Sequence, residues 1–171
     1  MSFDLPKTDN LNKEERYQLI LEQIKALTAG EDNLLANLAN ASALLFNLLP
    51  DLNWAGFYLL YAEELILGPF QGLPACIRIP VGKGVCGTAV KENRTIRVEN
   101  VHEFPGHIAC DAASNSEIVL PLRVKGEVVA VLDLDSPKLS RFDEIDQKYL
   151  ELFVQHLENS AEFIIEYKPF A

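Results

Sequence analysis

Three cysteines are the residues of this chain with the clearest potential for chemistry. Cys76, Cys86 and Cys110 follow the spacing C-x9-C-x23-C, so no pair forms the close motif of redox dithiols or zinc knuckles. Thiol–disulfide exchange needs an attacking thiol and a resolving thiol that folding brings together. Cys86 falls in the first turn of an expected helix, where free N–H groups and the helix dipole favour a thiolate. We therefore expect thiol chemistry, although each cysteine taken alone could be a small buried apolar residue.

Cys110 lies in a long polar segment, residues 102–117, that turns at Pro105–Gly106 and leads directly into an expected strand. Long loops on compact domains are usually functional or disordered, and this one carries aromatic, histidine and cysteine residues that disordered segments tend to lack. His102 and His107 could complete a metal site with Cys110, but a loop cysteine with two histidines is a weak pattern. We expect a loop laid over a pocket, with Cys110 as its reactive thiol.

Three acidic residues could share that pocket. Asp133 and Asp135 lie two residues apart at the end of an apolar strand, so their side chains point to one face. Glu117 begins the expected partner strand and would lie near them. Three carboxylates around one cavity suit an ammonium group, or hold a proton for transfer when repulsion raises a pKa. Trp54 and Tyr58, four apart on another strand, also share a face and predict either core packing or a pocket wall.

A glycine-rich segment follows Pro80 and formally matches the dinucleotide fingerprint G-x-G-x-x-G at Gly82–Gly87. Pro80 argues against a central parallel strand before it, and no βαβ unit surrounds it. We reject a dinucleotide site. What remains is a helix N-terminus whose N–H groups could hold a small carboxylate.

The apolar periodicity predicts an α+β domain. Helices are expected over about Leu11–Leu27, from an Asp32 cap to Pro50, over Val85–Asn93, and from an Asp143 cap to about Tyr167; strands are expected over Asn53–Tyr61, Leu65–Leu67, Cys76–Pro80, Thr95–Val98, Ile118–Val124 and Glu127–Leu134, with a loop through Gly68–Pro69 and Gln71–Gly72. A central antiparallel sheet of about six strands would carry the N- and C-terminal helices on one face and a loop-covered pocket on the other.

Size and charge narrow the function classes. A chain of 171 residues, 49% hydrophobic and 23% charged, is expected to form one domain with its own core. The net charge of −10 and the lack of a basic patch argue against nucleic acid. The sequence shows no apolar run of about 20 residues and no secretory signal, which predicts a cytoplasmic protein without membrane contact. In that reducing compartment three cysteines are not a structural framework.

The motifs around these residues resemble a known family. GPFQGLPACIRIPVGKGVCGTA, FPGHIACDAASNSEIVLP and VLDLDSP closely resemble the free methionine-(R)-sulfoxide reductases, which are single GAF domains. The similarity runs from about Asn53 to Ser136, and it implies a single GAF domain over residues 1–171. Ala130 stands where the family pattern suggests glycine, a change that leaves the site residues intact.

The resemblance implies a reaction. Cys110 matches the nucleophile that attacks the sulfoxide sulfur of the free amino acid and becomes a sulfenic acid. Cys76 matches the principal resolving cysteine, and Cys86 an auxiliary thiol. Thioredoxin would reduce the resulting disulfide, with no bound metal, flavin or nucleotide.

The same resemblance places substrate contacts. Trp54 and Tyr58 match an aromatic wall around the methyl group and thioether, and Glu117, Asp133 and Asp135 match an acidic cluster that holds the amino group and assists proton delivery. The substrate carboxylate would meet N–H groups around Gly82–Cys86. A GAF-type sensor of a small ligand or of redox state remains the alternative. The leucine-rich N-terminal helices could pack internally or against a second copy, which leaves a homodimer open.

Overall fold

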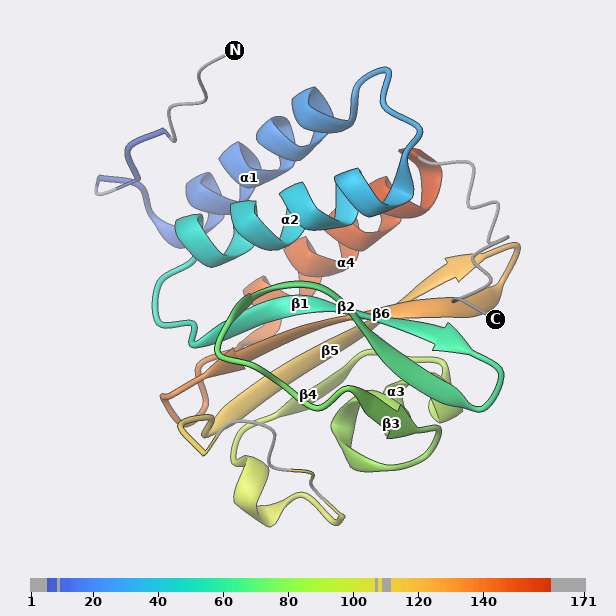
Figure 1. Cartoon of the computed structure of the whole chain (residues 1–171). Helices are drawn as coiled ribbons and strands as arrows, with labels where there is room; N and C mark the ends of the chain where they lie inside the picture. The colour runs from blue at the N-terminus through green and yellow to red at the C-terminus, as the bar shows by residue number, and fades with distance from the viewer. Residues whose placement is uncertain (1–5, 9, 107, 109–111, 161–171) are drawn as a thin grey trace.

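The computed structural model describes residues 6–8, 10–106, 108 and 112–160. Within these residues the chain forms α1 (Lys13–Thr28), α2 (Leu34–Leu48), β1 (Trp54–Tyr61), β2 (Glu64–Gly72), β3 (Arg78–Pro80), α3 (Gly84–Glu92), β4 (Ile96–Val98), a 3-10 turn at Val101–Glu103, β5 (Ser116–Val124), β6 (Glu127–Ser136) and α4 (Glu144–Ser160). The strands form one antiparallel sheet in the order β3-β2-β1-β6-β5-β4. Helices α1, α2 and α4 lie on one face and α3 on the other (Figure 1). The predicted α+β architecture is confirmed.

Strands β5 and β6 separate the two faces of the sheet by simple alternation. Ile118 and Leu120 pack into the core beneath α1, α2 and α4, whereas Val119 between them belongs to the core beneath α3. The same period of two sends Leu132 and Leu134 to the helical face and Asp133 to the other. The hairpin turns at Lys125–Gly126, whose φ angles of 52° and 87° suit a tight two-residue turn, as predicted.

The helical layer agrees with the predicted apolar stripes, with three corrections. Asn33, rather than Asp32, caps α2, because its side chain accepts the Ala36 N–H at 3.0 Å. In α4 the predicted stripe is largely buried, but Leu152 is 42% exposed. Most leucines of the predicted α2 stripe pack in the core beneath the helices, but Leu35 is 55% exposed. The expected continuation of α4 toward Tyr167 lies outside the described residues.

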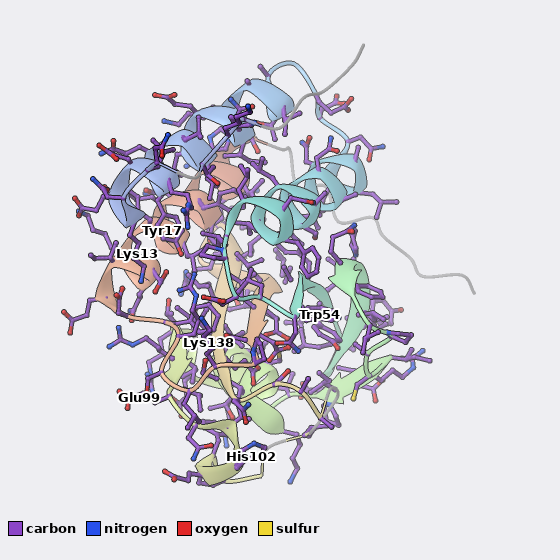
Figure 2. The ribbon with its side chains drawn as sticks, turned by 90° about the vertical axis from the view of Figure 1, so that its left-hand side faces the viewer. Lys13, Tyr17, Trp54, Glu99, His102 and Lys138 are labelled. Atoms are coloured by element: carbon purple, nitrogen blue, oxygen red, sulfur yellow. The ribbon has the colours of Figure 1, made fainter. Side chains whose placement is uncertain are left out.

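A buried carboxylate ties the helical layer together. Asp146 of α4 is fully buried and accepts hydrogen bonds from the Tyr17 hydroxyl at 2.7 Å and from the Arg141 guanidinium at 3.0 Å. Lys13 of α1 pairs with it as well, and the Asp143 N–H donates to it at 2.8 Å. Figure 2 shows Lys13 and Tyr17 together on the helical side of the molecule. We call these five residues the helix-face charge cluster.

Strand β2 is longer than the sequence indicated. The segment expected as a loop, Gly68–Gly72, continues the pairing with β1, and the register shifts between Gly56 and Tyr58. Pro69 is tolerated because it falls at this bulge, where no ladder N–H is required. Gly56 permits the close approach, since a Cβ there would lie 2.4 Å from Cβ of Phe70. None of the helices in the described residues has the length and apolar character needed to cross a membrane.

Candidate active site

The face of the sheet that α3 covers contains a small cavity of about 30 Å³, enough for about one water molecule. Its lining comes from β1, β3, α3, β5, β6 and the long loop: Tyr58, Ile79, Gly84, Val85, Cys86, Ile108, Ser114, Glu117, Asp133 and Asp135. Segments far apart in the sequence therefore converge here, and three of the lining side chains are acidic.

The three predicted carboxylates lie together because of strand register. Glu117 is directly opposite Asp135 in the β5–β6 pairing, and Asp133 is two residues earlier on the same face. Glu117 and Asp133 are each only 6% exposed. Of the ion pairs in the described part of the chain, none involves either residue. Two buried carboxyl groups thus lie side by side without a cation there.

This arrangement makes the pair hold protons. Burial raises the pKa of Glu117 well above its usual range, and the neighbouring Asp133 and Asp135 charges raise it further. Burial also raises the pKa of Asp133, to about 7, although hydrogen bonds from Cys86 and Glu117 act in the opposite direction. Since adjacent carboxylates cannot both ionise cheaply, the pair keeps a proton near neutral pH.

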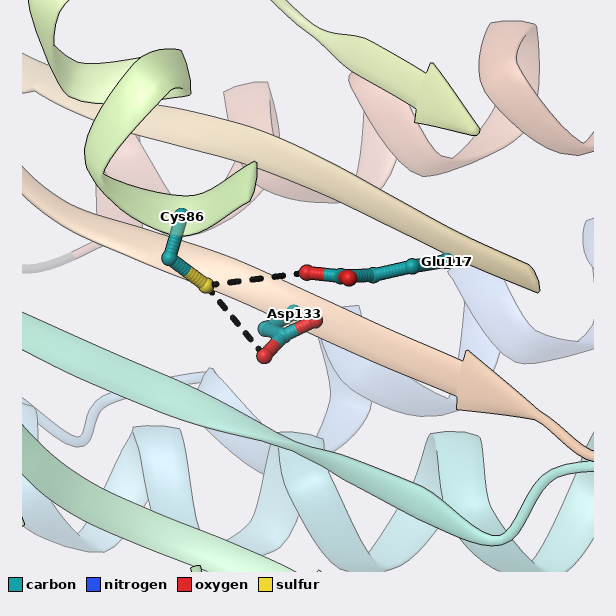
Figure 3. Close-up of side chains that lie close together, drawn as sticks. All are labelled: Cys86, Glu117 and Asp133. Carbon is teal, nitrogen blue, oxygen red and sulfur yellow. Dashed lines mark hydrogen bonds between the residues drawn. The ribbon is translucent and has the colours of Figure 1, made fainter. Parts of the chain in front are cut away.

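Cys86 points from the first turn of α3 into this pair (Figure 3). Its Sγ lies 3.3 Å from Oδ2 of Asp133 and 4.0 Å from Oε1 of Glu117, and the thiol is free. Burial and the two carboxylates raise its pKa well above the ordinary value. The expectation of a thiolate from the helix dipole is therefore wrong, because burial of the thiol and the neighbouring carboxylates outweigh the dipole.

The same geometry bears on metal binding. The Cys86 sulfur and one carboxylate oxygen from each of Glu117 and Asp133 lie within 4.8 Å of one another, so one ion could contact all three. Oδ1 of Asp133 has no hydrogen-bond donor among the described groups. The closeness equally lets the two carboxyl groups share one proton, which their raised pKa values favour.

Cys76 lies on the segment between β2 and β3 and is half-buried and disulfide-bonded. The Tyr58 hydroxyl donates to its backbone carbonyl at 3.0 Å, and the Trp54 indole N–H donates to the Leu73 carbonyl at 3.2 Å. Trp54 stacks between Tyr58 and Phe70, with ring centroids 5.8 and 5.3 Å away. Trp54 and Tyr58 thus position the segment that carries Cys76. Of these two residues, Tyr58 lines the cavity and Trp54 does not.

Comparison with known proteins places the chain in a family. Residues 36–160 match the GAF domain family model. The chain is 58% identical to the free methionine-R-sulfoxide reductase of Escherichia coli over 148 residues, which cover 86% of this chain and 90% of that protein. The chain belongs to the free methionine-R-sulfoxide reductase family of GAF domains.

Solved structures of this family agree with the fold. The enzyme of Staphylococcus aureus in complex with substrate superposes with a TM-score of 0.81 at 52% identity, covering 84% of this chain and 94% of that one. The Neisseria meningitidis reductase, in complex with its substrate, gives a TM-score of 0.84 at 42% identity, with 94% and 93% covered. Each of these two structures has a substrate bound.

Other residues of this family member line the cavity without having been singled out from the sequence. Ser114 is buried and its Oγ accepts from the Asn53 amide at 3.0 Å, while Ile79, Val85 and Ile108 supply apolar walls. In the sequence, the only feature that could have indicated these residues is their position within or beside the motifs that contain the cysteines. His102 lies outside the cavity and contacts Asn115 at 2.9 Å. His107 and Cys110 lie outside the described residues.

The glycine-rich segment serves packing in this reductase family member. A Cβ on Gly87 would lie 2.4 Å from the Pro80 carbonyl, so glycine lets α3 start directly against the end of β3. The Gly82 N–H donates to the Gly87 carbonyl at 2.8 Å, which closes the turn. Gly84 and Val85 then line the cavity at the N-terminus of α3. The segment therefore presents a helix N-terminus to the pocket, where N–H groups attract anions.

Proposed function

We propose that this protein reduces free L-methionine-(R)-sulfoxide to L-methionine, with Cys110 as nucleophile and thioredoxin as electron donor. The observation that carries this proposal is the buried pair Glu117–Asp133, which has no cation among the described residues and lies in the cavity beside the Cys76 segment. Such a pair suits a substrate that brings its own ammonium group and needs a proton. The reductases of the same family, two of them solved with substrate, support the choice.

The two ends of the cavity offer opposite charges to a free amino acid. The ammonium group would be held by Asp133 and Asp135, and the carboxylate by N–H groups of Gly84–Cys86 at the start of α3. Tyr58, with Trp54 behind it, would contact the methyl and thioether part. A site that pairs both termini of an amino acid excludes a peptide. Because the cavity holds about one water molecule, we expect binding to displace part of its lining, and the lining residues outside helices and strands are Ile108 and Ser114.

The chemistry follows from thiol reactivity. The Cys110 thiolate attacks the sulfoxide sulfur, and the sulfoxide oxygen takes a proton from the carboxyl pair. The oxygen ends on Cys110 as a sulfenic acid, and methionine leaves with the two electrons the thiol supplied. Cys76 then attacks the sulfenic sulfur, water leaves, and a disulfide forms. A cytoplasmic dithiol returns both sulfurs to thiols.

The contacts of Glu117 and Asp133 suggest a different role for each carboxyl group. Asp133 accepts from Cys86, which favours its anionic form, whereas Glu117 has the like charges of Asp133 and Asp135 beside it. Glu117 is thus the proton donor and Asp133 the anion for the ammonium group. Cys86, expected as an auxiliary thiol, is buried with a raised pKa, so from this position it acts as a hydrogen-bond donor rather than as an attacking thiolate.

The experiment is thioredoxin-coupled NADPH consumption with the separate R and S epimers of free methionine sulfoxide. We expect turnover on the R epimer alone and its loss in Cys110→Ser. Cys86→Ser is the matched control, because serine retains a donor toward Asp133, and it should keep turnover within a few-fold. No turnover on either epimer by folded, reduced protein would refute the proposal and favour a ligand-sensing GAF domain. Turnover that survives in Cys110→Ser would refute the assignment of the nucleophile.

A further inference from the structure

The segment that carries Cys76 also carries the most exposed large apolar side chains of the described residues. Leu73 is 63% exposed and Ile77 is 70% exposed, and Cys76 lies between them. Scattered exposed apolar side chains need no explanation, but two beside the disulfide-bonded sulfur of Cys76 suggest a contact surface.

The exposure is built into the structure and does not reflect a loose segment. The Trp54 indole N–H donates to the Leu73 carbonyl at 3.2 Å, and the Leu67 N–H donates to the Ile77 carbonyl at 3.0 Å. Between them, the Tyr58 hydroxyl donates to the Cys76 carbonyl at 3.0 Å. Three donors from β1 and β2 therefore hold the backbone of the segment by its carbonyls. A surface ordered before binding loses less conformational freedom when a partner docks.

Charge is absent from the same stretch. Residues 70–77, with the sequence FQGLPACI, contain no ionisable group other than Cys76, although the chain has 25 acidic and 15 basic residues. A partner that approached this surface would meet apolar side chains and not the negative charge that dominates the protein. Redox encounters between proteins use small interfaces, so two apolar side chains around the reacting sulfur can form a large part of one.

We propose that Leu73 and Ile77 form the docking surface on which a thioredoxin-type dithiol protein reduces the Cys76 disulfide. This inference rests on the proposed function, which requires an external two-electron donor in each turnover. One thiolate of the partner attacks Sγ of Cys76, a mixed disulfide forms, and the sulfur previously bonded to Cys76 leaves as a thiolate. The partner's second thiolate then attacks its own mixed-disulfide sulfur and releases Cys76 reduced, which leaves the partner oxidised.

The test compares two double variants. Leu73→Ser with Ile77→Ser removes the apolar surface but retains the anchored carbonyls, and neither side chain lines the cavity. Leu35→Ser with Leu139→Ser is the matched control, since these leucines are 55% and 60% exposed and lie on α2 and on the β6–α4 connection. Each oxidised protein is mixed with reduced thioredoxin or with dithiothreitol, without methionine sulfoxide, and the appearance of protein thiols is timed.

We expect the Leu73/Ile77 variant to lose about tenfold or more in its second-order rate constant with thioredoxin, and to keep the wild-type rate with dithiothreitol. The control variant should match the wild type with both reductants. Equal rates for all three proteins with thioredoxin would overturn the docking surface. Reduction of the wild type by dithiothreitol but not by thioredoxin would overturn the choice of partner.

A trapping experiment locates the attacked sulfur. A thioredoxin whose second active-site cysteine is replaced by serine should accumulate as a mixed disulfide, and peptide mass mapping should find it on Cys76. Capture on a different cysteine would contradict the proposal. Both experiments omit the sulfoxide, so a failure of the proposed reaction would appear separately, as a lack of turnover in protein that thioredoxin still reduces.

Discussion

Both faces of the sheet bury carboxylates, but the groups that surround these carboxylates differ in charge. On the helical face Asp146 is fully buried and meets two cations, a phenol hydroxyl and a backbone N–H. On the pocket face Glu117 and Asp133 are nearly as buried, and their side chains contact the Cys86 thiol and each other, with no cation among the described residues. A compensated buried carboxylate fixes structure, whereas an uncompensated one costs stability and is typical of a functional site.

The pH dependence of stability should differ in sign between the faces. Asp133 has a folded-state pKa of about 7, above its unfolded value, so the folded state retains a proton that the unfolded state releases. Stability from this group therefore falls as pH rises from about 4 to 7. At Asp143, burial raises the pKa, but hydrogen bonds from Lys13 and from the N–H of Asp146 lower it to about 2. Its stabilisation is present above about pH 4 and is lost as pH falls through about 2.

The largest expected effect is on the helical face. Asp146→Ala leaves the nearly buried Arg141 without its anion and leaves Lys13 paired with Asp143 alone, so the free energy of unfolding should fall by about 3–5 kcal/mol. Urea denaturation measures it. Glu64→Ala is the control, because it breaks an exposed ion pair with Arg78 and should cost less than about 1 kcal/mol. Equal losses in the two variants would contradict the structural role of the helix-face charge cluster.

On the pocket face, removal of a carboxyl group should make the stability of the protein less dependent on pH. Asp133→Asn removes the group that retains a proton, so between about pH 4.5 and 7 the fall in unfolding free energy should become shallower by up to about 1.4 kcal/mol per pH unit. Turnover measured above about pH 7, where Asp133 is ionised, should drop about 100-fold or more, because the ammonium group loses its anion. Urea denaturation at several pH values and the coupled assay measure the two effects.

A matched variant tests whether the change in slope belongs to the pocket. Asp143→Asn alters a carboxyl group whose pKa lies near 2, so the slope above pH 4.5 should stay as in the wild type. If Asp133→Asn left the slope unchanged as well, the two buried carboxyl groups would not be sharing a retained proton.

The smallest expected effect concerns the thiol between the carboxylates. Cys86→Ala removes the donor to Asp133, so the pKa of Asp133 should rise, by up to about one unit for a hydrogen bond worth about 1 kcal/mol. The rising limb of kcat/KM against pH should move upward accordingly, and Cys86→Ser should restore it. A profile that moves equally in both variants would show that the sulfur acts by its own chemistry and not as a donor.

Local patterns were enough to predict much of the fold and the face on which the site lies. Period-two alternation placed Asp133 and Asp135 on one face. The Lys125–Gly126 turn pairs Val124 with Glu127, but a bulge between Leu122 and Arg123, which the sequence did not predict, shifts the register by one residue so that Glu117 lies opposite Asp135. The Asp143 cap was also predictable, and its side chain accepts the N–H groups of Ile145 and Asp146. These features depend on residues close in sequence or on strand register.

Other features could not be read in advance because they depend on neighbours distant in sequence. Strand β2 extends past Pro69 because Gly56 on β1 admits Phe70 and a bulge absorbs the proline. Cys86 has the helix position of an activated thiol, yet burial against two carboxylates from β5 and β6 keeps its proton. Trp54 lies behind Tyr58 and anchors the segment of Leu73.

The sequence by itself therefore determined the elements, the face each side chain takes and the family, because alternation, caps and tight turns act over a few residues. Only the tertiary structure decided the charge states of the site residues and which of their side chains contact one another. Desolvation and the Coulomb interaction depend on which groups from separate elements come within a few ångströms of one another. Asp146 and Asp133 are the same type of residue, and both are buried. Their roles are opposite because Asp146 meets cations, whereas Asp133 meets a thiol and a second carboxyl group.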